Sequence, residues 1–274
     1  MSDQDTTNVL VEAFASGILD SLQEFWFSHF QDETHIIVPS SRDIDVWFVN
    51  KSDEFDGSCR YVSLSCPPRE SRTLSQLTQF SDKFGPLLNL IFSHQYSAND
   101  ILTAAKPTSA LDWMSLIILL DQIPRNCYRG MEAAKVFNFF DPLALAIALE
   151  AKELSIHQRP EVRYKLGHRL WIFMPFEHAE NIGMQELMVE EQKERFKDVE
   201  MLMHGEVDKG DVNTAFWRGV LMRKIEEFGA LKRIMQKAVD EHYDAIKKFG
   251  RFPYRNVALR RSSTREEQAF LDAM

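Results

Sequence analysis

Cysteine is scarce in this chain of 274 residues, with three present. Cys59, Cys66 and Cys127 lack the paired spacing of zinc ligands, and their odd number does not suit a disulfide framework. They are typical of reduced thiols. The first ten residues have neither the basic nor the apolar region of a secretory signal. We therefore expect a cytoplasmic protein.

A long hydrophobic run and an excess of basic charge are also absent. Met114–Leu120 contains a single polar residue, but it is too short to cross a membrane. Asp and Glu number 41 against 32 Lys and Arg, so the formal net charge is −9. Because phosphate backbones require a basic face, this charge disfavours nucleic acid as a partner. We expect a protein that binds neither membranes nor nucleic acids.

Several motifs of known chemistry are missing. The sequence has no G-x-S-x-G nucleophile motif, no dinucleotide fingerprint, no glycine-rich phosphate loop and no aspartate-rich metal motif. His178-Ala179-Glu180 matches the H-x-E of zinc deaminases, but the partner P-C-x-x-C is absent. We expect no cofactor and no metal. The alternative is an Mg²⁺ ion held by Glu177, Glu180 and Asp121.

The residues that are present predict a single all-α domain over 1–274. Hydrophobic residues make up 45% of the chain, enough for a sizeable core, and 20 Phe and 5 Trp suit packing between helices. Helical periodicity appears over 9–30, 74–91, 133–154 with a break near Asp141-Pro142, 186–203 with a solvated charged face, and 215–248 with a kink near Gly229. Residues 34–68 predict an irregular excursion with room for a short hairpin. Residues 249–274 predict an arginine-rich turn and a short helix that Thr264 and Glu267 cap.

The segment 111–130, LDWMSLIILLDQIPRNCYRG, carries a polar group directly after an apolar helix. We expect Pro124 to end this helix near Gln122, which places Asp121 at the negative end of the helix dipole. A carboxylate is unfavourable there, and such violations concentrate at functional sites. The structural alternative is that Asp121 and Arg125 only tie down a buried turn.

Two further segments follow the same pattern. Residues 174–181 read MPFEHAEN and follow an apolar aromatic run with another turn expected at the proline, and 249–256 read FGRFPYRN. The first supplies Glu177, His178 and Glu180. In the second, Arg255-Asn256 follows a proline, as Arg125-Asn126 does. We expect the three segments to converge on one pocket.

These segments, together with DPLALAIAL from Asp141 and the continuation VALRRSSTREEQAFL after Asn256, resemble the signature blocks of the domain-of-unknown-function 924 family. Fainter matches are EFWF at Glu24 and WFVNKSDEFD at Trp47, so the resemblance covers most of the chain. It implies an all-helical fold of tetratricopeptide-like antiparallel helix pairs and no established activity. Ala179, Asn181 and Tyr254 depart from the residues usual in the family, which are Ser, an acid and His.

The titratable residues predict acid–base chemistry on a small anionic metabolite. Seven Lys and Arg and no acid lie between Lys247 and Arg265, and arginine binds carboxylate or phosphate through two donors at once. His178 is the candidate proton carrier, because imidazoles exchange protons near neutral pH. The predicted catalytic residues are His178, Glu177, Glu180 and Asp121, and the predicted substrate-binding residues are Arg125, Asn126, Gln122, Arg251, Arg255 and Asn256.

Two alternatives stay open at this point. The arginines also suit a structural network with the acids, and one unsatisfied arginine within such a network is still an anion site. The reaction expected of an enzyme is that of a lyase, isomerase, cyclase or hydrolase. The other class of function is a helical-repeat scaffold whose concave face binds a peptide or protein.

Overall fold

The computed structural model describes residues 3–48, 74–206 and 213–273, and within these ranges the chain forms helices and no β-strand. The first half contains α1 (Asp3–Ala15), α2 (Ile18–Trp26), α3 (Glu33–Ile37), α4 (Ser41–Phe48), α5 (Leu74–His94), α6 (Ala98–Ala105) and α7 (Ala110–Cys127). The second contains α8 (Ala133–Lys135), α9 (Asp141–Glu153), α10 (Leu166–Glu177), α11 (Ile182–His204), α12 (Thr214–Arg223), α13 (Ile225–Phe249) and α14 (Arg265–Asp272). Short 3₁₀ helices are η2 (Gly130–Glu132), η4 (Ile156–Gln158) and η5 (Pro253–Arg255), and η3 (Val136–Phe140) is a π-helix. The expected all-α class is confirmed.

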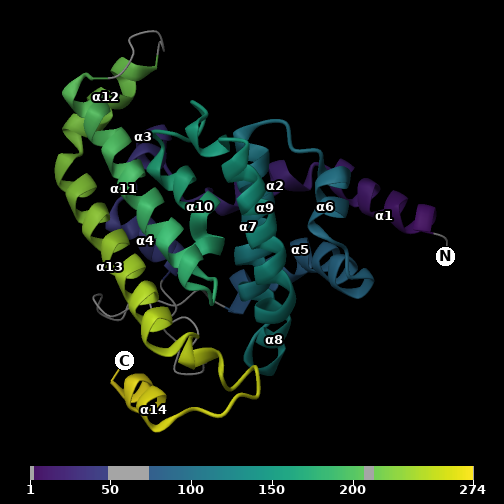
Figure 1. Cartoon of the computed structure of the whole chain (residues 1–274). Coiled ribbons are helices and arrows are strands. Elements are labelled where there is room, and N and C mark those ends of the chain that lie inside the picture. The colour runs from purple at the N-terminus through teal and green to yellow at the C-terminus, as the bar shows by residue number, and fades with distance from the viewer. Residues whose placement is uncertain (1–2, 49–73, 207–212, 274) are drawn as a thin grey trace.

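Helix α7 lies at the centre of the molecule. It packs against α2, α5, α9 and α10, and every residue from Met114 to Leu120 is buried. A helix surrounded in this way needs apolar side chains on all its faces, which explains its composition. Helix α10 joins α7 to α11, and α11 in turn packs along α13 (Figure 1). The segment after α13 folds back beneath this layer and ends in α14 (Figure 1).

Pro124 and Pro175 lie inside helices, and the prediction that they end these helices was wrong. Helix α7 continues through Pro124 to Cys127, and α10 continues through Pro175 to Glu177. A proline removes one backbone hydrogen bond, but Tyr128 N still donates to Pro124 O at 2.8 Å. Both prolines are buried, and packing against neighbouring helices holds each helix together at the proline. Asp121 consequently lies well inside α7, beyond the reach of the helix-end dipole.

Other predicted boundaries also need correction. The helix expected over 9–30 is two helices, since Gly17 takes a left-handed conformation at φ 73° and turns the chain between α1 and α2. Residues 33–37 and 41–48 are helical where an irregular excursion was expected, and 49–68, with the possible hairpin, lies outside the described residues. The break in the last long segment falls at Lys224 and not at Gly229.

The segment around Asp141 is helical without interruption from α8 through η3 to α9. Pro142 occupies the first turn of α9, as expected, but Asp141 does not cap the helix. The capping box of α14 is confirmed: Glu267 N donates to the Thr264 hydroxyl, and the Glu267 carboxylate accepts from Thr264 N.

The charged face predicted for α11 is only partly solvated. Glu190, Lys193, Glu194 and Lys197 are exposed, whereas Glu191 and Arg195 are buried against neighbouring helices. None of the helices in the described ranges is long and apolar enough to cross a membrane.

Candidate functional site

The centre of the candidate site is a contact between Asp121 and His178. Packing of α10 on α7 brings His178, which follows the last turn of α10, to Asp121, and its Nδ1 lies 2.7 Å from Asp121 Oδ1. The side chain of His178 is 12% exposed and that of Asp121 is fully buried. The carboxylate accepts a hydrogen bond from Nδ1–H, so Nε2 is the nitrogen available to exchange a proton with a ligand. Nε2 makes no hydrogen bond within the described part of the chain.

Asp121 is held as a carboxylate by its neighbours. Gln122 Nε2 donates to Oδ2 at 2.6 Å, and Arg125 Nη2 lies 3.4 Å from Oδ1. Burial by itself raises the pKa of this carboxyl group, but the charges of His178 and Arg125 outweigh burial and lower the pKa to about 2. Asp121 therefore carries its charge at neutral pH and fixes the imidazole ring.

Two arginines meet at Asp141, a residue that sequence reasoning did not select. Arg125 Nη2 lies 2.6 Å from Asp141 Oδ1, and Arg255 Nη1 lies 3.1 Å from Oδ2. Arg255 also donates to the backbone carbonyl of His178 at 2.8 Å, and its guanidinium lies over the ring of Phe137. Arg255 is 3% exposed, so it joins α9 to the end of α10 from inside the protein.

Glu177 belongs to a second acid–histidine pair. Its Oε1 lies 3.1 Å from Nδ1 of His242 on α13, and both side chains are buried. Burial lowers the pKa of His242 although Glu177 opposes this shift, so the neutral imidazole is favoured. The rings of His178 and His242 are 6.4 Å apart between centroids. His242 therefore faces the same region as His178.

The remaining predicted residues lie toward the C-terminal segment. Glu180 accepts from Arg261 at 2.8 and 3.0 Å and from the backbone N–H of Phe252 at 2.9 Å. Arg251 makes a two-pronged ion pair with Glu267, and Asn256 donates to Ser263. Asn126 donates to the carbonyl of Gln122 within α7. Direct contacts thus join Asp121, Gln122, Arg125, His178 and Arg255, whereas Arg251 and Asn256 secure the C-terminal segment.

The three carboxylates of the Mg²⁺ alternative each have a different partner: His178 and Arg125 hold Asp121, His242 holds Glu177 and Arg261 holds Glu180. A closer set of metal-type side chains in the described residues is His157, Glu191 and Glu194, whose ligand atoms lie within 4.8 Å. Arg169 already binds Glu191 at 2.7 Å. Burial and the charge of Arg169 lower the pKa of His157 to about 4, and the same positive charge opposes a cation there.

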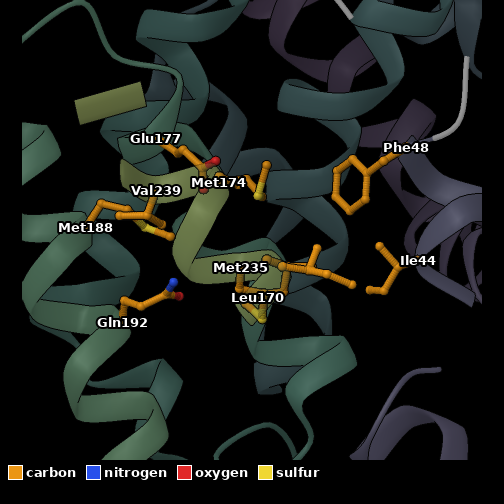
Figure 2. Close-up of a pocket in the computed structure, with 11 residues that line it drawn as sticks. Ile44, Phe48, Leu170, Met174, Glu177, Met188, Gln192, Met235 and Val239 are labelled. Atoms are coloured by element: carbon orange, nitrogen blue, oxygen red, sulfur yellow. The ribbon is translucent and has the colours of Figure 1, made fainter. Parts of the chain in front are cut away.

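A pocket lies between α4, α10, α11 and α13, beside this network (Figure 2). Its empty volume is about 420 Å³. Apolar side chains form most of its wall: Ile44, Phe48, Leu170, Met174, Met188, Ile234, Met235, Ala238 and Val239. Glu177 and Gln192 complete the lining, and Glu177 is the one predicted site residue in it.

The sequence offered little sign of Asp141, since an Asp before a proline at a helix start is an ordinary cap. The buried ion network of α10 and α11 was also missed. There Arg169 binds Glu191 at 2.7 Å and Asp198 at 2.6 Å, and Arg169 sits in a run of apolar residues. An arginine within a run of apolar residues could have predicted a buried ion pair.

Fold and site together define an all-helical protein with a buried acid–histidine–arginine network at its centre. The family comparison agrees with the resemblance seen in the sequence: residues 22–274 match the family described as bacterial proteins of unknown function, DUF924. The chain belongs to this family.

Among solved structures, a protein of unknown function from Agrobacterium tumefaciens is similar in fold. The two share 21% sequence identity with a TM-score of 0.52, over 94% of this chain and 99% of the other. At this identity the likeness concerns the fold alone. The comparison with curated proteins found no match.

Proposed function

We propose that this protein is an enzyme in which His178 transfers a proton to or from a small anionic metabolite. The observation that carries the proposal is the contact of fully buried Asp121 with Nδ1 of His178, which leaves Nε2 without a hydrogen bond in the described residues. A histidine oriented by a carboxylate in this way is a suitable general base and, once protonated, a general acid. The reaction classes that fit are those of a lyase, isomerase, cyclase or hydrolase.

In this proposal each residue of the network has a separate role. His178 is the catalytic residue, and Asp121 is a positioning residue that stabilises the imidazolium formed during the reaction. Gln122 orients Asp121 through its side-chain amide. Arg125 is the proposed contact for the anion, because its side chain is 17% exposed whereas that of Arg255 is 3% exposed.

Of the three arginines predicted from the sequence to bind the substrate, only Arg125 is proposed to contact the anion. Arg255 is engaged with Asp141 and the carbonyl of His178, and Arg251 is engaged with Glu267. In the proposal these two arginines hold the surrounding segments in place and do not contact the anion. We place the reaction in the cytoplasm, on the ground of the thiol pattern of Cys59, Cys66 and Cys127.

The test is a thermal-shift screen of small carboxylates and phosphate esters, with and without EDTA, followed by turnover assays of the anions that bind. We expect Arg125→Ala to weaken binding of an active anion by at least about tenfold. His178→Ala should abolish turnover while affinity stays within about tenfold, because a proton carrier acts mainly on the chemical step.

The control is Lys135→Ala, which also removes a basic side chain. Lys135 forms a partly exposed ion pair with Glu132 and has no ion pair with Asp121, Asp141 or His178 in the described residues. It should leave binding and turnover unchanged. Full turnover by His178→Ala would reject the catalytic role. Stabilisation by a peptide or a protein, with no response to any anion, would favour the scaffold alternative.

A further inference from the structure

Arg195 of α11 is a buried cation that forms no ion pair with the residues that the structure describes. Its side chain is fully buried, and no carboxylate of the described residues lies within 4.0 Å of it. The adjacent Glu191 binds Arg169 instead. Burial lowers the pKa of Arg195 to about 10, so the guanidinium remains charged at neutral pH. Its Nε and Nη1 groups lack acceptors, which is costly for a buried charged donor.

The hydrogen bond that Arg195 does make determines the orientation of Gln192. Nη2 of Arg195 donates to Oε1 of Gln192 at 2.5 Å. Because a guanidinium can only donate, the amide must present its oxygen to Arg195 and its NH₂ group elsewhere. Nε2 of Gln192 is buried and has no acceptor among the described residues. The amide NH₂ group of Gln192, which the charge of Arg195 polarises, is therefore an unsatisfied hydrogen-bond donor.

The amide donor of Gln192 lies at the apolar pocket. Gln192 lines the pocket, and its amide end is directed into it from α11, opposite Ile44 and Phe48 of α4 (Figure 2). Met188, Met235 and the other apolar residues form the wall between these ends. The empty volume of about 420 Å³ includes space that is open to solvent.

The second polar residue of the lining does not supply the missing acceptor. Glu177 is bound to His242 at 3.1 Å and lies more than 4.0 Å from the guanidinium of Arg195. A ligand that complements this pocket must thus have an apolar part, which packs against the apolar wall, and an anionic group, which accepts a hydrogen bond from Gln192. A cationic or purely apolar occupant leaves the amide donor of Gln192 without an acceptor.

We propose that the pocket between α4, α10, α11 and α13 binds a monocarboxylic acid with an apolar tail. The carboxylate accepts from Nε2 of Gln192, Arg195 polarises that amide from behind, and the tail lies along the methionine-rich wall. Gln192 and Arg195 have no direct contact with the His178–Asp121 pair in the described structure, so this site stands independently of the proposed reaction.

The experiment compares three probes of equal chain length by isothermal titration calorimetry on the full chain. Decanoate carries the proposed anionic head, decan-1-ol is neutral, and decylamine is cationic. We expect decanoate to bind at least about tenfold more tightly than either of the others, the difference expected for a hydrogen bond between a charged and a neutral partner.

The decisive variant is Gln192→Glu, which keeps the shape of the side chain and gives Arg195 a carboxylate partner. It should fold, and it should weaken decanoate binding by at least about tenfold while changing decan-1-ol binding by less than about threefold. The matched control is Gln268→Glu on the exposed surface of α14, which makes the same change of charge away from the pocket. It should bind decanoate like the original protein.

Circular dichroism melts establish that both variants are folded before they are compared. Equal affinity for decanoate and decan-1-ol, or unchanged decanoate affinity in a folded Gln192→Glu, would overturn the proposal. Preference for decylamine would overturn it as well, because Glu177 would then be the charged contact. Failure of all three probes to bind would have the same consequence, and none of these results bears on turnover by His178.

Discussion

At the scale of single residues, Asp121 shows how a charge is kept in the middle of an apolar helix. Removing a carboxylate from water costs several kcal/mol unless donors replace the lost solvent. Gln122, Arg125 and His178 supply such donors, from the same helix and from the end of α10. The charge therefore stabilises one particular packing of α7 on α10, since a shift of either helix would separate Asp121 from His178.

We expect Asp121→Asn to destabilise the protein by about 3 kcal/mol at neutral pH, because it removes the charged partner of His178 and one of the two carboxylates that face Arg125. The pKa of Asp121 is about 2 in the folded protein and about 3.9 in an unfolded chain. A lowered pKa contributes stability above pH 4, and this contribution is lost as the pH falls toward 2. The difference in melting temperature between the two proteins should thus shrink between pH 4 and pH 2.

Thermal melts over pH 7 to 2 measure this difference. Asp240→Asn is the control, because Asp240 is exposed and bonded only to a neighbouring glutamine side chain in α13. Its melting temperature should follow that of the original protein at every pH. A constant gap for Asp121→Asn down to pH 2 would show that Asp121 does not carry the charge described here.

At the scale of elements, α11 combines two faces that the sequence does not distinguish. Glu190 and Glu191 are neighbours in a run of charges, but 100° of rotation per residue directs one to solvent and the other to Arg169 of α10. Arg195, four residues after Glu191, follows it to the buried side. The contact between α10 and α11 is accordingly ionic where Arg169 meets Glu191 and includes apolar side chains elsewhere along the two helices.

Replacing Glu191 by Ala should cost about 3–5 kcal/mol, because it leaves Arg169 buried with one acid fewer. Glu190→Ala removes the same group from the exposed face and should change stability by less than about 0.5 kcal/mol. Urea denaturation of the two variants provides the measurement. Equal stabilities would mean that Glu191 is solvated and that α11 is rotated relative to the structure.

At the scale of the whole molecule, the C-terminal segment is attached to the core through a few polar contacts. Glu180 receives both the Phe252 N–H and the Arg261 side chain, across 72 and 81 residues of sequence. Arg251 and Glu267 then hold α14 against the same turn. This arrangement keeps Arg255 beneath His178, so the candidate site depends on residues at the far end of the chain.

We therefore expect Glu180→Gln to loosen this attachment, since a neutral amide is a weaker partner for Arg261. Hydrogen–deuterium exchange should rise in residues 250–272 and stay unchanged in α7. Glu186→Gln, at an exposed position of α11, should show neither effect. Uniform protection of 250–272 in Glu180→Gln would show that apolar packing of Phe252 and Tyr254 holds the segment without Glu180.

The sequence by itself determined the helical class, the buried run of α7 and the capping box of α14. Each of these depends on contacts between residues three or four positions apart, so the local pattern contains the necessary information. The nearness of polar residues to the ends of apolar helices was visible in the same way. The resemblance of several sequence blocks to the DUF924 family identified the same family as the comparison over residues 22–274.

Only the tertiary structure decided which polar groups meet. Asp121 and His178 are 57 residues apart, and Arg255 reaches His178 across 77, so their contacts follow from the packing of whole helices. Burial likewise decided that α7 continues through Pro124 and that Arg195 lies inside, because surrounding side chains outweigh local preferences. A sequence pattern records the period of a helix, whereas the partner on each face depends on the helices that cover it.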